Sequence, residues 1–491
     1  MTRGFLLALD QGTTGSRALI YDRRANVVSS SYQEFPQYYP KPGWVEHDPE
    51  QIWRSVLSVI RKSLNSARLK FSDILVIGIT NQRETVVIWD KKTGKPFYNA
   101  IVWQDRRTSS YCAELKKRGL EKMVSAKTGL LLDPYFSATK IHWLLENITG
   151  LKHKALKGQA LAGTMDTWLL WKLSGGRTHE TDFTNASRTL LFNIRTRKWD
   201  IELLKLFKIP HQMLPSVKSS GSDFGVTDIK KFPGQARIFS MIGDQQAALY
   251  GQSCYKAGES KNTYGTGCFL LMNIGEKFKK PPIGLLATLA CSSDGKSVYA
   301  FEGSVFIAGA AIQWLRDGLE LFTKASETEK LIKTIKDTGG VVFVPAFAGL
   351  GAPYWRPNAR GMISGITRGT RKAHIIRAAL ESIAQQTADI LEVMQKGAGY
   401  RLKVLKVDGG ATRNKFLMQF QADLLRIPVK VSEISESTAW GAAKLAARAS
   451  GFWGSRHEQK YLTKRPQISS FESTRLRKQW KREISRLLTD F

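Results

Sequence analysis

The chain opens with Leu7-Ala8-Leu9-Asp10-Gln11-Gly12-Thr13-Thr14-Gly15-Ser16-Arg17, an apolar run that ends on an acid and passes into a turn of small residues. The run predicts a strand from Phe5 to Asp10, with a returning strand from Arg17 to Tyr21. Glycine lets the backbone of such a turn approach a ligand closely, and its N–H groups and hydroxyls can face phosphate oxygens. An acid beside the turn can hold Mg²⁺ directly or through water.

Two later segments share this composition, Tyr264-Gly265-Thr266-Gly267 and Val407-Asp408-Gly409-Gly410-Ala411. Each turn alone is a weak signal, because an ordinary hairpin explains it equally well. Together the three turns predict one polyphosphate site in an ATP-using enzyme, with the nucleotide between two domains. A Walker A loop is absent, since Ala290 stands where the first glycine before Gly295-Lys296-Ser297 is required.

Composition indicates a globular protein with more than one domain. The chain has 491 residues, of which 42% are hydrophobic, and no apolar run of about 18 residues, so we expect no membrane span. The short apolar start ends on an acid, so we also expect no secretory signal. The four cysteines form no CxxC pair, which argues against a zinc site or disulfide framework and favours a cytoplasmic protein.

The net charge of +32 allows two interpretations. One is a nucleic-acid partner, and the other is a surface that favours anionic nucleotides. No nucleic-acid motif appears, so we prefer the second. The basic residues are densest in a tail from about residue 453, where they alternate with Leu476, Trp480, Ile484 and Leu487 and predict a solvated amphipathic helix. These basic residues are Arg475, Arg477, Lys478, Lys481, Arg482 and Arg486.

Strands and amphipathic helices alternate along the chain, which predicts an α/β fold. The clearest helix start is Asp48-Pro49-Glu50-Gln51, where Asp48 can cap and Pro49 suits the first helical position. We place a domain boundary near residue 250.

Six longer runs resemble one family, the glycerol kinases, a branch of the carbohydrate kinases within the actin-like ATPase superfamily. The resemblance extends over nearly the whole chain, and the first loop is similar to the first phosphate motif of that superfamily. The runs are Lys41–Pro49, Gly78–Thr85, Asn99–Arg107, Asp133–Phe136, Gly243–Ala248 and Tyr264–Phe269.

This resemblance implies two actin-like domains with RNase H-like cores, residues 1–250 and 251–491, with mixed sheets flanked by helices and an active site in the cleft between them. The first domain would bind glycerol and phosphate, and the second would bind the nucleotide. The expected ligands are glycerol, ATP or ADP, and Mg²⁺, and relatives form homodimers or homotetramers.

The resemblance also implies roles for particular residues. Asp10 matches the acid that handles Mg²⁺. The matched glycerol-binding positions are Arg83, Glu84, Tyr135, Asp244 and Gln245, with Trp103 and Phe269 as apolar walls. The matched nucleotide positions are Thr13, Thr14, Arg17, Thr266, Gly309, Gln313, Gly410 and Asn414. Gly15 lies in the same phosphate loop, where many relatives have serine.

The residue types suit a triol, whose hydroxyls both donate and accept. Arg83 only donates, whereas the Glu84 and Asp244 carboxylates only accept. Asp244 would take the proton of a terminal hydroxyl as it attacks the γ-phosphorus of ATP, while Arg17, Mg²⁺ and the threonine-rich loops offset charge. Read without the resemblance, Arg83 and Glu84 could be a surface ion pair, and Trp103 could be core packing.

Three alternatives remain. A kinase of another polyol or ketose would need a larger pocket than Trp103 and Phe269 leave. A nucleotide switch without small-molecule turnover would lack a second polar cluster near the γ-phosphate. A nucleic-acid-binding protein rests on charge alone.

Overall fold

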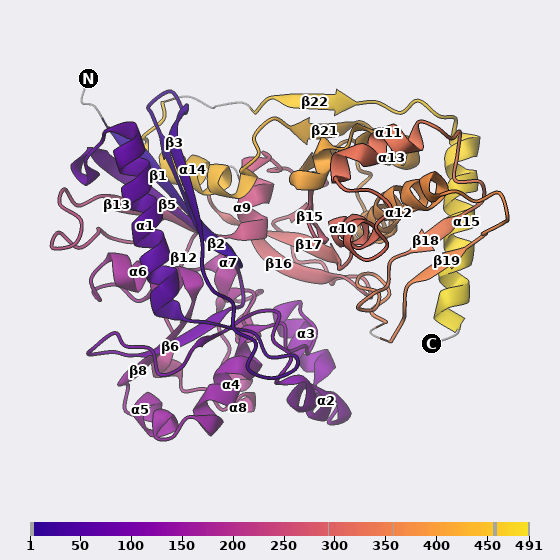
Figure 1. Cartoon of the computed structure of the whole chain (residues 1–491). Coiled ribbons are helices and arrows are strands. Elements are labelled where there is room, and N and C mark those ends of the chain that lie inside the picture. The colour runs from indigo at the N-terminus through magenta and orange to yellow at the C-terminus, as the bar shows by residue number, and fades with distance from the viewer. Residues whose placement is uncertain (1–3, 293, 357, 455–458, 490–491) are drawn as a thin grey trace. The chain divides into compact units, whose positions relative to one another are not determined.

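The computed structural model describes residues 4–292, 294–356, 358–454 and 459–489. Two compact units are present, and each contains a mixed β-sheet with flanking helices, which confirms the predicted α/β class (Figure 1). No helix in these ranges is long and apolar enough to cross a membrane.

The chain passes between the two units more than once. The first unit runs to Tyr255 and adds Ala287–Tyr299 and a segment that begins at Ser437. The second unit comprises Lys256–Leu286, Ala300–Glu436 and a segment that begins at Gln459. The first unit is therefore completed by residues that lie far beyond residue 250.

The first unit is built on a five-stranded sheet in the order β3-β2-β1-β5-β13. The first three strands of the chain form an antiparallel meander, and β5 and β13 continue the sheet in parallel with β1. The strands are β1 (Phe5–Gln11), β2 (Gly15–Tyr21), β3 (Val27–Glu34), β5 (Ile74–Asn81) and β13 (Arg237–Gly243). The predicted hairpin at the start of the chain is confirmed.

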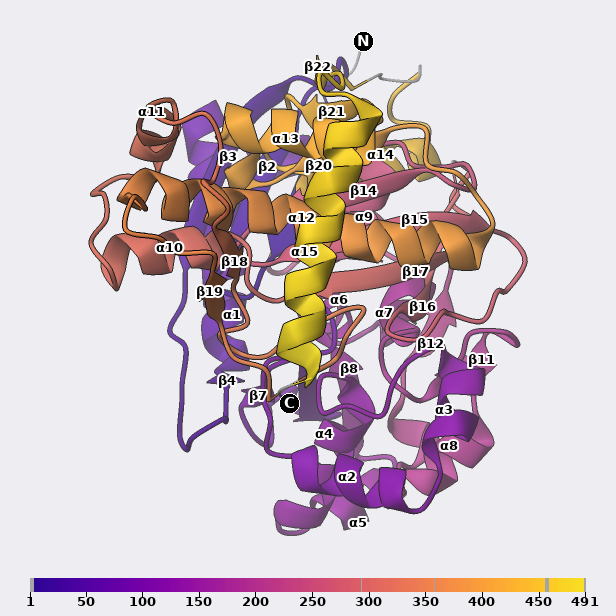
Figure 2. The same cartoon turned by 90° about the vertical axis from the view of Figure 1, so that its right-hand side faces the viewer.

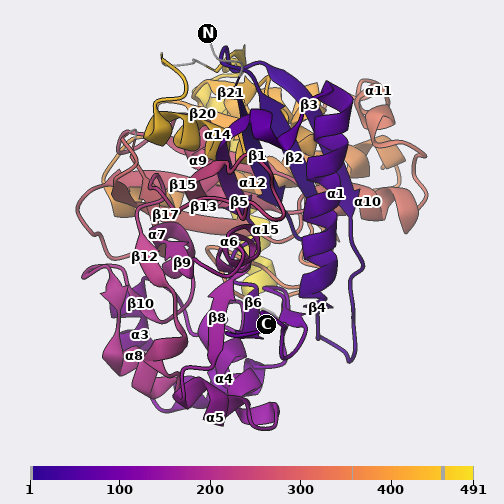
Figure 3. The same cartoon turned by 90° about the vertical axis from the view of Figure 1, so that its left-hand side faces the viewer.

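Helices cover both faces of this sheet. On one face Leu7 and Leu9 join a core that includes Trp53 of α1 (Pro49–Ala67) and residues of α6 (Met165–Leu173). Figure 3 shows α1 lying across the meander. On the other face α14 (Ser437–Ser450) packs so closely that a Cβ on Gly78 would lie 2.6 Å from the Ala442 carbonyl oxygen. The second helix on this side is α9 (Asp244–Gly251).

Local signals explain α1. The Asp48 carboxylate accepts hydrogen bonds from the N–H groups of Glu50 (2.8 Å) and Gln51 (3.3 Å), and Pro49 takes the first helical position. The helix ends at Arg68, which has a left-handed backbone with φ of 55°. This is the helix start that the sequence predicts.

The rest of the first unit carries loops and short elements around a small sheet in the order β4-β7-β6-β8. That sheet consists of β4 (Glu46–His47), β6 (Val86–Asp90), β7 (Ala100–Ile101) and β8 (Ala160–Thr164). Its helices are α2 (Ser109–Lys117), α3 (Glu121–Thr128), α4 (Ser137–Asn147), α5 (Leu151–Leu156), α7 (Phe183–Ala186) and α8 (Ile201–Leu206). The remaining strands are β9 (Glu180–Asp182), β10 (Phe192–Asn193), β11 (Lys198–Trp199), β12 (Ser216–Lys218) and β16 (Leu286–Cys291).

The second unit repeats the first sheet order, with β17-β15-β14-β20-β21 followed by β22. As in the first unit, the leading strand pairs with an antiparallel hairpin partner on one side and a parallel strand on the other. The strands are β14 (Ser260–Tyr264), β15 (Cys268–Gly275), β17 (Ser297–Val305), β20 (Leu405–Asp408), β21 (Val429–Ser432) and β22 (Tyr461–Lys464). The turns at Gly12 and Gly265 therefore occupy equivalent places in the two sheets.

The helices of the second unit include the long helix α12, which α15 crosses (Figure 2). They are α10 (Gly309–Asp317), α11 (Thr328–Ile332), α12 (Lys372–Ala398), α13 (Lys415–Leu425) and α15 (Ser470–Thr489), beside a hairpin of β18 (Val342–Val344) and β19 (Met362–Ser364).

The basic tail forms the predicted amphipathic helix, α15, but the helix is not solvated on every side. Its apolar residues pack into a core, where Trp480 is 2% exposed. Arg477 is also buried, and two carboxylates of α12 neutralise its charge. Asp389 lies 2.5 Å from Arg477 Nη2, and Glu392 lies 2.8 Å from the same atom. The prediction of a solvated helix is wrong for this face, since the carboxylates that neutralise Arg477 lie some 85 residues earlier in the chain.

Candidate functional site

Arg83 is the centre of a polar cluster at the ends of β5 and β13. Its Nε lies 3.1 Å from Asp244 Oδ1 and 3.8 Å from Glu84 Oε1, and its Nη1 donates to Gln246 Oε1 at 3.1 Å. The Arg83 side chain is 2% exposed, whereas that of Asp244 is 29% exposed. Gly243 makes room for this arrangement, because a Cβ there would lie 2.8 Å from the Arg83 side-chain carbons. Four of the predicted substrate residues thus adjoin, since Gln245 follows Asp244 and donates its N–H to that carboxylate at 2.7 Å.

Glu84 is held at both ends. Its carboxylate accepts from Arg188 Nε at 2.6 Å, and both side chains are almost fully buried. Its carbonyl oxygen accepts from Ser137 Oγ at 3.2 Å and from Lys140 Nζ at 3.4 Å. The residue has a φ of 63°, a left-handed backbone that is uncommon for a residue with a side chain. Strain at such a position persists only where the surroundings fix it, as these contacts do.

Lys140 of α4 joins the Glu84 loop to the segment that carries Tyr135. The fully buried ammonium donates to the carbonyl oxygens of Tyr135 (2.5 Å) and Phe136 (3.1 Å) as well as that of Glu84. Burial lowers the pKa of Lys140 to about 8, although nearby carboxylates oppose this shift. The lysine therefore fixes the backbone on which two predicted substrate residues stand.

Trp103 and Tyr135 form an aromatic corner. Their ring centroids are 5.5 Å apart, and the rings meet edge to face at 80°. Trp103 Nε1 also donates to Thr13 Oγ1 at 2.9 Å, which ties the predicted substrate wall to the first glycine-rich turn. The cluster and this turn are therefore parts of one region of the first unit.

Gly15 begins β2 beneath the ring of Tyr32. A Cβ at Gly15 would lie 2.6 Å from atoms of that ring, so a serine here would displace it. The Arg17 guanidinium carbon lies 5.0 Å from the centroid of this ring, and the Tyr32 hydroxyl shares a 3.4 Å hydrogen bond with Thr14 Oγ1. Tyr32 thus gives a physical reason for glycine at this position.

Asp10 lies where β1 ends and is the candidate magnesium ligand. Thr438 Oγ1 donates to its Oδ2 at 2.6 Å, and no hydrogen bond to Oδ1 is found among the described residues. Burial raises the pKa of Asp10 to about 6, the Thr438 hydrogen bond opposes this, and Asp244 adds to it. No group of three or more metal-ligating side chains occurs in the described ranges. The donor set still fits Mg²⁺, which is usually bound by one or two carboxylates together with waters and phosphates.

The second and third glycine-rich turns meet within the second unit. A Cβ at Gly409, whose φ is 95°, would lie 2.4 Å from the Tyr264 carbonyl oxygen. The Thr266 carbonyl oxygen accepts from the N–H groups of Ala308 (2.9 Å) and Ala310 (3.1 Å). Gly309 lies against Gly265, where a Cβ would clash with its carbonyl oxygen at 2.6 Å. The turns that the sequence predicts as phosphate-binding are thus adjacent here, together with the start of α10.

The other predicted site residues of this unit differ in their exposure to solvent. Gln313 is exposed on α10, and Gly410 is exposed beside Gly409. Asn414 caps α13 by accepting from the Leu417 N–H at 2.8 Å, so its predicted nucleotide contact remains a prediction. Phe269 is half-buried on β15, and its role as a wall of the substrate site also remains a prediction.

Sequence reasoning missed four polar residues that support the cluster: Lys140, Arg188, Gln246 and Thr438. Local spacing gives little signal for them, because Arg188, Gln246 and Thr438 each contact a partner at least 104 residues away and Lys140 reaches Glu84 across 56 residues. Gln246 is the exception that could have been found, since it lies inside the quoted run Gly243–Ala248.

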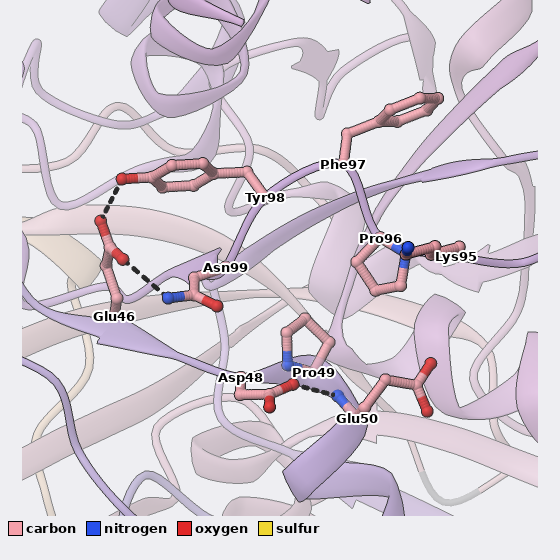
Figure 4. Close-up of a pocket in the computed structure, with 9 residues that line it drawn as sticks. All are labelled: Glu46, Asp48, Pro49, Glu50, Lys95, Pro96, Phe97, Tyr98 and Asn99. Carbon is pink, nitrogen blue, oxygen red and sulfur yellow. Dashed lines mark hydrogen bonds between the residues drawn. The ribbon is translucent and has the colours of Figure 1, made fainter.

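A separate hollow of about 450 Å³ lies in the first unit (Figure 4). Its carboxylates already have partners: Glu46 accepts from Tyr98 Oη at 2.8 Å, Asp48 caps α1, and Glu50 pairs with Lys172 at 2.8 Å. This hollow contains none of the predicted site residues, and its charges serve the fold.

The repeated sheet order, with a glycine-rich turn at the same place in each repeat and a buried polar cluster in the first, defines a two-domain kinase fold. A family model described as the N-terminal domain of the FGGY family of carbohydrate kinases matches residues 5–251, and the model of the C-terminal domain matches residues 260–450. The chain belongs to the FGGY family of carbohydrate kinases.

Within this family the chain is most usefully compared with glycerol kinases. Glycerol kinase 2 of Thermotoga maritima is 54% identical over 489 residues, covering 99% of both chains. The glycerol kinase of Carboxydothermus hydrogenoformans is 54% identical over 492 residues, covering 99% of this chain and 98% of the relative.

A solved glycerol kinase structure is also similar to this chain over nearly its whole length. The Plasmodium falciparum glycerol kinase with ADP has a TM-score of 0.93 and 38% identity, covering 99% of this chain and 98% of that one. A gluconate kinase from Lactobacillus acidophilus, at 22% identity and a TM-score of 0.85, shares the fold.

Proposed function

We propose that this protein transfers the γ-phosphoryl group of ATP to glycerol, giving sn-glycerol 3-phosphate and ADP, with Mg²⁺ as the metal ion. The observation that carries the proposal is the cluster in which Arg83 lies between the carboxylates of Glu84 and Asp244. Whole-length similarity to glycerol kinases supports the choice of substrate.

The cluster matches the chemistry of a small polyol. Arg83 can donate to a hydroxyl oxygen, while the carboxylates of Glu84 and Asp244 can accept from hydroxyl hydrogens. Neighbouring donors and acceptors on rigid, buried supports can fix two vicinal hydroxyls in one orientation. Trp103 and Tyr135 supply apolar surface for the carbon chain.

We assign Asp244 the role of general base. Its side chain is the more exposed member of the pair with Arg83, and it stands at the first position of α9, directly after β13. It would accept the proton of the attacking terminal hydroxyl, while Arg17 and the glycine-rich turns would stabilise charge on the phosphoryl oxygens. Mg²⁺, held by Asp10, would neutralise charge on the phosphates.

The test is ADP release from Mg·ATP by purified protein with glycerol, dihydroxyacetone, xylulose, ribulose or gluconate, with the products identified. We expect release that strongly favours glycerol and yields glycerol 3-phosphate. Turnover of a ketose in preference to glycerol would contradict the substrate assignment. The absence of ADP release with all five compounds would contradict the kinase activity itself.

We also propose that the protein is a cytoplasmic homodimer or homotetramer that binds no nucleic acid. Light scattering after size-exclusion chromatography measures the oligomeric state, and a monomer would contradict the proposed dimer or tetramer. Salt-dependent binding of single- or double-stranded DNA or RNA would contradict the last.

A further inference from the structure

The charged tail helix has no part in the proposed reaction, yet it lines a hollow of the second unit. This hollow has a volume of about 850 Å³, within the range of small-molecule sites. Its walls come from α12, α13, α15 and the loop of residues 336–340. All of these segments belong to the second unit.

The cations of α15 divide into two groups. Those that face α12 or lie near Glu483 are in ion pairs: Arg477, Lys481, Arg482 and Arg486. Arg482 also lines the hollow, as do Arg475 and Lys478, which are three residues apart and hence on one side of the helix. Among the described residues neither takes part in an ion pair, and both are exposed.

The hollow also contains carboxyl groups, and each of the two buried ones has a partner. Glu381 accepts from Arg377 Nε at 2.8 Å, and burial raises the pKa of Glu381 to about 7. Asp423 Oδ1 accepts from the Gln467 N–H at 2.6 Å and from Gln419 Nε2 at 3.0 Å. Neither buried carboxyl forms an ion pair with Arg475 or Lys478, and, together with the exposed Asp337 and Glu472 of the lining, they offer acceptors for hydroxyl hydrogens.

Apolar surface completes the lining. The rings of Phe416 and Phe420 stack with centroids 5.8 Å apart, and Arg377 lies 5.1 Å from the centre of the Phe416 ring. The hollow thus combines hydroxyl acceptors and an apolar wall with five cations, of which Lys336, Arg475 and Lys478 form no ion pair among the described residues.

We propose that this hollow is a binding site for a small phosphorylated sugar. Arg475 and Lys478 bind the phosphate, and the carboxyl and amide groups of α12 and α13 bind hydroxyls. Phosphate is matched to paired cations by charge and hydrogen bonding. A nucleic acid fits less well, because the cations are grouped over one hollow and not spread along an open surface.

The experiment is isothermal titration calorimetry of the full chain at fixed ionic strength. The ligands are glucose 6-phosphate, ribose 5-phosphate, glucose and inorganic phosphate. We expect one of the two sugar phosphates to bind at least tenfold more tightly than inorganic phosphate, and glucose to give no heat. Failure of both sugar phosphates, or equal affinity for inorganic phosphate, would overturn the proposal.

Matched variants locate the site. Arg475→Gln with Lys478→Gln removes two positive charges from the hollow and should weaken binding at least tenfold. Lys481→Gln with Arg486→Gln removes the same charge from the same helix outside the hollow and should change affinity less than twofold. Equal weakening by both pairs would mean that overall charge governs binding, which contradicts a site here. Because the readout is binding, the result is independent of kinase turnover.

Discussion

Asp244 is the residue on which the proposed chemistry depends most directly. Asp244→Asn keeps the size of the side chain but removes its ability to take a proton. We expect glycerol binding to persist while kcat falls by about 10²–10⁴-fold, the usual contribution of a general base. Single-turnover kinetics and calorimetric glycerol binding separate the two effects. An unchanged kcat would contradict the assignment of the base.

Arg188 should act on glycerol through Glu84. Arg188→Met leaves the Glu84 carboxylate with Arg83 as its guanidinium neighbour, so Glu84 should lose its fixed orientation. We expect the KM for glycerol to rise about 10–100-fold, equivalent to about 1.4–2.8 kcal/mol, with the KM for ATP little changed.

Arg118→Met is the control, because Arg118 makes an exposed ion pair with Glu114 in the same unit. It should leave both KM values unchanged, as exposed pairs contribute little. An equal rise in both KM values for Arg188→Met would indicate general damage to the fold and not a positioning role. Circular dichroism establishes whether the variant is folded.

At the scale of the element, the crossing of α9 and α14 depends on a glycine. A Cβ at Gly441 would lie 1.9 Å from the Ala247 carbonyl oxygen, which cannot move without shifting α9. Helix propensity alone would favour alanine by about 1 kcal/mol. Overpacking of this kind costs about 1–3 kcal/mol, so we expect Gly441→Ala to lower the free energy of unfolding.

Denaturant unfolding measures this effect, with Ala449→Gly as the comparison. Ala449 is exposed on the same helix, and glycine there should cost about 1 kcal/mol through propensity. Both changes should therefore destabilise the protein although they are opposite substitutions. A gain in stability for Gly441→Ala would mean that the two helices can separate without cost.

Elements with local signals could be predicted from the sequence, whereas their long-range partners could not. The hairpin around Gly12 and the helix that starts at Pro49 are encoded by turn and cap residues within a few positions. Arg477, by contrast, was predicted to be solvated and is buried, because only the folded chain brings Asp389 to it. Lys140 and Arg188 could not be predicted either, because their contacts with Glu84 form only in the folded chain. The kinase family could be predicted because long runs such as Gly243–Ala248 are specific.

At the scale of the whole molecule, acid should destabilise the protein through a half-buried histidine, His179. His179 lies against the rings of Trp89 and Trp171, and its Nε2 is 3.0 Å from the Ala162 carbonyl oxygen. Burial lowers the pKa of His179 from 6.5 to about 4. Between these values the unfolded chain binds a proton that the folded chain does not, so stability falls as the pH decreases through this window. The contribution is at most about 3 kcal/mol.

Several buried carboxyls, such as Asp166, have raised pKa values and act in the opposite direction, so the histidine effect must be isolated. The measurement is the difference in unfolding free energy between the wild type and His179→Gln, at pH 7 and at pH 4.5. We expect the advantage of the wild type to shrink at the lower pH. His153→Gln, at an exposed position, is the comparison variant. A constant difference for His179→Gln would contradict the burial argument.

The return of the chain to the first unit at Ser437 imposes an order on biosynthesis. Strands β1 and β5 are made early, but α14, which covers one face of their sheet, comes roughly 180 residues after Tyr255. At a translation rate of roughly 5–20 residues per second, that helix follows about 10–40 s later. Throughout this interval the apolar face around Leu6, Ala8 and Gly78 lacks its helix, so the nascent first unit is open to aggregation until α14 has been synthesised.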